Sequence, residues 1–105
     1  MQNSRSWALI SCLLLATALA AADLSGRVTV RGAPLVGAVV TANLLIAQKS
    51  TASVVVTRTG ARGEYALRGL RNGDYILLVD MNGRRIYQGR IALTSPTLIK
   101  NIELQ

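Results

Sequence analysis

Few side chains in this sequence could do chemistry, and none of them forms a recognisable catalytic set. The chain has no histidine, which removes the commonest general base and a usual zinc ligand. Its acidic residues show neither the spacing of a calcium loop nor an obvious acid/base pair. They are Asp23, Glu64, Asp74, Asp80 and Glu103. The serines after residue 22 lack a G-x-S-x-G context, which leaves a pairing of serine with Lys49 or Lys100 as the open alternative. We therefore predict a protein that is not an enzyme and that holds no metal or cofactor.

Basic side chains dominate the charge, with 12 Lys and Arg against 5 Asp and Glu and a net charge of +7. A positive surface attracts polyanions through a salt-screened field. If the first and sixth predicted strands lie side by side, their arginines form a basic patch for anionic polysaccharide or lipopolysaccharide. These arginines are Arg27, Arg31, Arg84, Arg85 and Arg90. The alternative is a solvated surface that only keeps the domain soluble. Nucleic acid is not expected, because aromatic side chains do not interleave the basic ones.

The first 22 residues have the organisation of a secretory signal peptide. Arg5 supplies the positive charge, and residues 7–19 form an apolar stretch too short to span a bilayer. Ala18-x-Ala20 and Ala20-x-Ala22 are both acceptable cleavage sites. We expect a helical signal peptide over 1–22, a domain over 23–105, and export to the periplasm or the medium without a stable membrane span after cleavage. A short membrane anchor, or a lipoprotein modified at Cys12, are the alternatives.

After the leader, short β-branched runs alternate with glycine, asparagine and proline, and no capped helical stripe is present. The predicted strands cover residues 26–31, 38–44, 54–57, 64–68, 75–79, 84–93 and 98–104. Residues 46–53 are predicted to be a polar connection. Asn82-Gly83 predicts a type I′ hairpin turn, because both central positions need positive φ. Short strands at this spacing predict an all-β, seven-stranded antiparallel Greek-key sandwich, with a small barrel as the alternative.

Residues 70–75 have the L-x-x-G-x-Y pattern of a tyrosine corner. In such a corner the tyrosine hydroxyl bonds to the backbone a few residues upstream, where the chain crosses between sheets. Leu70 would fill the core beneath the corner, and Gly73 would permit the tight turn. Tyr75 is therefore predicted to be a structural residue and not a ligand.

Several longer strings extend this pattern over nearly all of residues 23–105. They are residues 25–28, 32–40, 59–70, 72–75 and 102–104. Together they resemble the carboxypeptidase regulatory-like domains, relatives of the transthyretin-like (prealbumin-like) sandwich, here as a small secreted single-domain form. The resemblance implies a support, interaction or carbohydrate-contact domain, and it implies no reaction.

The leading hypothesis is an exported, non-enzymatic module that binds a protein or envelope partner, including a second copy of itself. Exposed sheet edges accept another strand, so an edge is a natural docking site. Ile76 and Leu78, with Val54 or Val55, are the candidate contact residues, unless loops bury them. The alternative function is a basic module that binds anionic polysaccharide or lipopolysaccharide.

Overall fold

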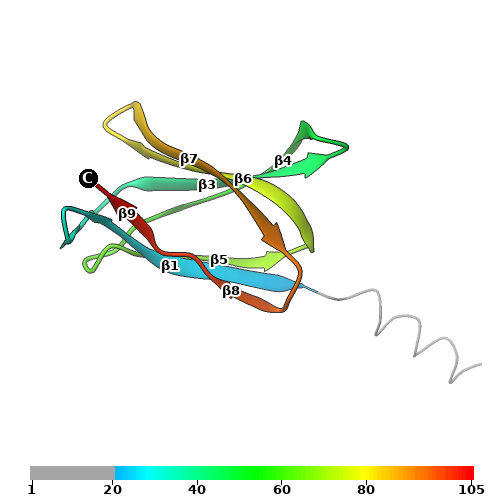
Figure 1. The fold of residues 1–105 in the computed structure, drawn as a ribbon, viewed down its shortest axis with the longest axis horizontal. Helices are drawn as coiled ribbons and strands as arrows, with labels where there is room; N and C mark the ends of the chain where they lie inside the picture. The colour runs from blue at the N-terminus through cyan, green and yellow to red at the C-terminus, as the bar shows by residue number, and fades with distance from the viewer. Residues whose placement is uncertain (1–20) are drawn as a thin grey trace, which may run out of the picture.

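The computed structural model describes residues 21–105, and every element in this part of the chain is a β-strand (Figure 1). The strands are β1 (Ala22–Val30), β2 (Ala33–Pro34), β3 (Val39–Ile46), β4 (Lys49–Arg58), β5 (Glu64–Leu70), β6 (Gly73–Met81), β7 (Arg84–Leu93), β8 (Thr97–Ile99) and β9 (Ile102–Leu104). Residues 21–105 contain no helix with the length and apolarity needed to cross a membrane. Nearly all of the predicted signal peptide lies outside the described residues.

The strands form two sheets that face each other, which confirms the predicted all-β sandwich (Figure 1). In the first sheet β1 is central, and it pairs with β2, β5, β8 and β9. The second sheet has the order β4-β3-β6-β7 and is antiparallel throughout. Consecutive strands therefore change sheet between β2 and β3, between β4 and β5, between β5 and β6, and between β7 and β8.

The predicted closing strand over 98–104 differs from the structure in two ways. It is divided into β8 and β9, and both run parallel to β1, because the chain returns from the second sheet in the direction of β1. At the break, the Lys100 amide donates to the Ser25 carbonyl (2.8 Å). The Arg27 amide donates to the side-chain oxygen of Asn101 (3.1 Å). A side chain thus replaces a backbone acceptor where the ladder is interrupted.

The connection predicted over residues 46–53 is also wrong, because β4 already begins at Lys49. A two-residue turn joins β3 to β4, with φ of 53° at Ala47 and 69° at Gln48. Neither residue type favours positive φ, so the sequence carries no signal for this hairpin. At the other hairpin Asn82 (φ 53°) and Gly83 (φ 78°) adopt the predicted conformation.

The core lies between the sheets and consists of alternate residues from both. Along β6, for example, Tyr75, Leu77 and Val79 are buried, while the residues between them are partly exposed. The largest fully buried side chains are Leu24, Leu67, Leu77, Leu93, Ile102, Val28, Val40 and Val79. Burial of each such side chain contributes about 1.5–3 kcal/mol relative to leaving it in water.

A buried tyrosine ties the C-terminal segment to the first sheet. The Tyr65 hydroxyl donates to the Lys100 carbonyl (2.5 Å), and the side chain is only 3% exposed. Burial raises the pKa of Tyr65 above its usual range, and the nearby Tyr87 adds to this rise. Gly26 is paired with Tyr65 across the β1–β5 ladder. A Cβ at Gly26 would collide with the Lys100 carbonyl and press on the Tyr65 ring, so this position needs glycine for space.

We predict that Gly26→Ala destabilises the domain by about 1–3 kcal/mol, the range for overpacking a tight site. The new methyl group would displace Lys100 from the ladder and break the bond from Tyr65. Urea unfolding followed by circular dichroism would measure the change. The neighbouring Ser25→Ala is the control and should stay within about 0.5 kcal/mol of the wild type. Equal midpoints for the wild type and Gly26→Ala would show that the segment around Lys100 is free to shift.

Candidate functional site

The tyrosine corner lies at the crossover from β5 in the first sheet to β6 in the second. The Tyr75 hydroxyl donates to the Arg71 carbonyl (2.7 Å), which is the bond that such a corner makes. Leu70 and Tyr75 are each 3% exposed, and Gly73 has φ of 151°. Burial raises the pKa of Tyr75, and the positive charge of Arg71 opposes this rise. The corner therefore uses its residues for packing and for a backbone bond.

Ile76 and Leu78 lie on the outer face of the second sheet, where they alternate with the buried residues of β6. Strand register places Thr41 between Leu78 and Val56, and Asn43 between Ile76 and Val54. We define the apolar strip as Ile76, Leu78, Val54 and Val56. Ile76 and Leu78 are half-buried, whereas Val54 is 46% and Val56 56% exposed. Val55 pairs with the inward-facing Ala42 and does not belong to the strip.

A shallow hollow of about 320 Å³ lies over Val54, Ile76 and Leu78.

Two ion pairs flank the apolar strip on the same face. At one end Arg85 Nε lies 3.0 Å from Asp80 Oδ1. At the other end Arg90 Nη2 lies 3.2 Å from Asp74 Oδ2, and Nη1 donates to the Gln48 side chain (2.6 Å). Arg85 and Arg90 therefore each have an aspartate beside them, whereas Arg58, two residues beyond Val56 on β4, forms no side-chain ion pair among the described residues. The strip consists of two apolar pairs on either side of Thr41 and Asn43.

The predicted patch of five arginines is not assembled, because the first and sixth predicted strands (β1 and β7) do not lie side by side. Arg27 belongs to β1 in the first sheet, and Arg31 follows that strand directly. Arg84, Arg85 and Arg90 belong to β7, the edge strand of the second sheet. Strand alternation cannot reveal this separation, since it depends on which strands become neighbours.

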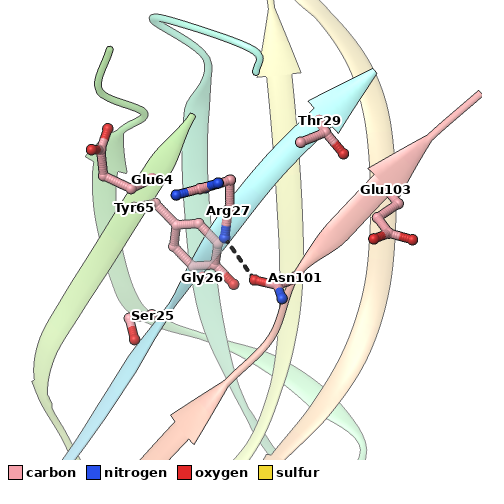
Figure 2. Close-up of a pocket in the computed structure, with 8 residues that line it drawn as sticks. All are labelled: Ser25, Gly26, Arg27, Thr29, Glu64, Tyr65, Asn101 and Glu103. Atoms are coloured by element: carbon pink, nitrogen blue, oxygen red, sulfur yellow. Dashed lines mark hydrogen bonds between the residues drawn. The ribbon is translucent and has the colours of Figure 1, made fainter. Parts of the chain in front are cut away.

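The sequence did not single out a polar groove of about 590 Å³ on the first sheet (Figure 2). Side chains from three neighbouring segments line it. They are Ser25, Gly26, Arg27, Thr29, Glu64, Tyr65, Asn101 and Glu103. The outward alternation of Arg27, Thr29 and Glu64 is the sequence signal that could have pointed to this face. Glu64 and Asp74 lie on different sheets, each next to an inward tyrosine, so these two carboxylates do not converge. Within residues 21–105, no group of three or more acidic, histidine or cysteine side chains is placed to hold a metal.

A match to a family model identifies the family of this sandwich. The model of the carboxypeptidase regulatory-like domain matches residues 23–105. The chain belongs to this family. No curated protein matches the sequence.

Solved structures share the sandwich of this carboxypeptidase regulatory-like domain at low sequence identity. The pilus 2b backbone protein of group B streptococcus has a TM-score of 0.62 and 14% identity, over 79% of this chain and 40% of that one. The chain thus spans less than half the length of the pilus protein. A Pseudomonas aeruginosa protein proposed to bind carbohydrate has a TM-score of 0.57 and 11% identity, over 81% and 89%. The dioxygenase domain of a Streptomyces sp. SirexAA-E fusion protein has a TM-score of 0.52 and 18% identity, over 79% of each chain. At these identities the likeness establishes the fold alone.

We predict that Tyr75→Phe lowers the free energy of unfolding of the carboxypeptidase regulatory-like domain by about 1–2 kcal/mol. The change keeps the buried ring but removes the hydroxyl that binds the Arg71 carbonyl. Urea titration at neutral pH would measure the loss. Tyr87→Phe is the matched control, because the Tyr87 side chain is only partly buried and should change stability by less than about 0.5 kcal/mol. An identical midpoint for both variants would mean that the corner does not hold the crossover.

Proposed function

We propose that this domain is an exported, non-catalytic interaction module that binds a protein partner of the cell envelope through the apolar strip. The observation that carries the proposal is the strip itself. Val54 and Val56 are about half exposed beside Ile76 and Leu78, on an outer face with a shallow hollow. Clustered apolar side chains that remain in contact with water mark interaction sites more often than do isolated ones.

The charges around the strip favour an apolar, protein-like partner over a polyanion. Arg85 and Arg90 are paired with Asp80 and Asp74, so both guanidinium groups are already partly neutralised. A partner that docks here would meet apolar side chains on both sides of Thr41 and Asn43, with charged pairs beyond them, and protein interfaces combine apolar and polar contacts. Such binding depends weakly on salt, because salt screens charge and leaves apolar burial in place.

The non-catalytic part of the proposal rests on how the acids are distributed. Asp74 and Asp80 are engaged with arginines, and Glu64 lies on the outer face of the other sheet. The chain has no histidine to complete a nucleophilic or metal-dependent site. Although one structural neighbour is a dioxygenase domain, a shared sandwich does not transfer a reaction. Another structural neighbour is a pilus backbone protein, which supports a non-catalytic role.

We expect export to remove the leader after Ala20, so that the mature chain begins at Ala21. Ala22 is fully buried and pairs with Leu70, so cleavage after Ala22 would remove a packed residue of β1. Intact-mass spectrometry of the exported protein would distinguish the two sites, since they differ by the mass of two alanines. A mass that retains residues 1–20, or that includes a lipid on Cys12, would contradict the expectation.

We predict that the mature domain captures its partner from envelope extract equally well at low and high salt. Leu78→Lys should reduce this capture by about tenfold or more, because it places a charge in the middle of the apolar contact. Ile99→Lys is the matched control, since Ile99 is 68% exposed on β8 of the other sheet. Quantitative mass spectrometry of the captured proteins would measure the effect.

Two outcomes would count against the strip. Capture by the wild type that disappears at high salt would indicate a charged contact instead. Equal capture by Leu78→Lys and the wild type would place the contact elsewhere. Circular dichroism of both lysine variants would establish that they remain folded.

A further inference from the structure

We infer that one end of the sandwich carries a second binding site, separate from the apolar strip, that takes an anionic polysaccharide. We call this end the basic end and define it by Arg31, Arg58, Arg62 and Arg84. Only Arg31 and Arg84 belonged to the patch predicted from the sequence. The basic end is composed of connections between strands and not of one strand face.

Strand direction brings the four arginines to the same end. Arg31 lies in the turn after β1, and Arg84 follows the turn between β6 and β7. Arg58 ends β4, and Arg62 lies in the connection from β4 to β5. The strand register agrees with this placement. In the second sheet Val39 pairs with both Arg58 and Asp80, so the end of β4 lies at the same level as the end of β6. In the first sheet Arg27 pairs with Glu64, so the start of β5 lies near the end of β1. In Figure 1 these connections lie at the end of the sandwich where the C-terminus is marked.

Hydrogen bonds hold the connections of the basic end against one another. Thr59 is only 5% exposed; its hydroxyl donates to the Leu35 carbonyl (2.6 Å) and accepts from the Ala38 amide (2.9 Å). Beside it, Arg58 Nη1 donates to the Gly37 carbonyl (3.3 Å). A hollow of about 350 Å³ lies between Arg58 and the turn at residues 82–83. Arginines on a fixed backbone need less ordering when they bind a ligand.

The charges of the basic end are largely available for a ligand. Among the described residues, none of its four arginines forms a side-chain ion pair, in contrast to Arg85 and Arg90. Asp80 is already engaged with Arg85. The Glu64 carboxylate accepts a hydrogen bond from the Arg62 backbone amide and offsets one positive charge, and Glu103, which pairs with Thr29, offsets a second. The basic end therefore keeps a net positive charge.

The arrangement favours a polymer over a single small anion. Arg58 and Arg84 belong to the second sheet, whereas Arg31 lies at the end of the first sheet. Because packed sheets lie about 10 Å apart, arginines on both layers can engage several anionic groups at once. A polysaccharide with repeated carboxylate, phosphate or sulfate groups supplies them, and each guanidinium can bind such a group with two hydrogen bonds. Nucleic acid is less favoured, because Tyr65 and Tyr75 are buried and Tyr87 packs against the core opposite Val79.

The test compares two double variants of the mature domain that lose the same charge. Arg58→Gln with Arg84→Gln removes two arginines from the basic end. Arg68→Gln with Arg71→Gln removes two exposed arginines toward the opposite end, where only the Arg71 backbone serves the tyrosine corner. Heparin is the polysaccharide probe, and calorimetry at several salt concentrations measures its affinity.

We expect the first double variant to bind heparin about tenfold or more weakly, and the second to change affinity by less than about threefold. Arg58→Lys with Arg84→Lys keeps the charge but not the paired hydrogen bonds, so it should restore part of the binding. Circular dichroism of each variant controls for folding. Leu78→Lys should bind heparin like the wild type. The proposal for the basic end and the proposal for the apolar strip are therefore tested separately. An equal loss of heparin affinity in both double variants would show that binding depends on overall surface charge, and it would overturn the proposal. Absent binding by the wild type, or tighter binding of single-stranded DNA than of heparin, would also overturn it.

Discussion

The structure depends on fixing the places where the chain crosses between its two sheets. No cysteine occurs after residue 12, so disulfides cannot hold these crossings within residues 21–105. Hydroxyl groups take this role by donating to backbone carbonyls: Tyr75 to Arg71 at the β5–β6 crossing, and Thr59 to Leu35 between the β4–β5 and β2–β3 connections. Tyr65 donates to Lys100 in the same way within the first sheet. All three side chains are buried, and each bond satisfies a hydroxyl that would otherwise be costly to bury. The outer faces and loops can then vary in composition without loosening the fold.

Most inward positions of β1, β3, β5, β6 and β7 are committed to the core, so function is left to the outward positions and to the connections. These surfaces differ sharply in character. The second sheet presents an apolar strip between two ion pairs, and the first sheet presents a polar groove with Arg27 and Glu64. The unpaired arginines Arg58 and Arg84 lie at one end. Apolar and charged contacts are therefore separated in space, and salt should affect them differently.

Local patterns predicted those parts of the fold that depend on neighbours in the sequence. Alternation located the strands, Asn82-Gly83 marked one hairpin, and the L-x-x-G-x-Y string marked the corner at Tyr75. The hairpin at Ala47-Gln48 was missed because neither residue type favours positive φ. The parallel direction of β8 and β9 was missed because it follows from the route between the sheets, which no local pattern encodes. Arg58 and Arg62 were overlooked for the same reason: they meet Arg31 and Arg84 only through the order of the strands.

Two aspartates account for the division between the apolar strip and the basic end. Asp74 and Asp80 alternate with inward residues of β6, so both must face outward on the same side as Ile76 and Leu78. Their register opposite β7 places them beside Arg90 and Arg85. Without these pairs, two more guanidinium groups would flank the strip, and the whole outer face would attract polyanions. Exposed ion pairs contribute little to stability, so the main effect of these two pairs is to offset the positive charge beside Ile76 and Leu78. A chain with a large excess of arginine can thereby keep one face suited to an apolar partner.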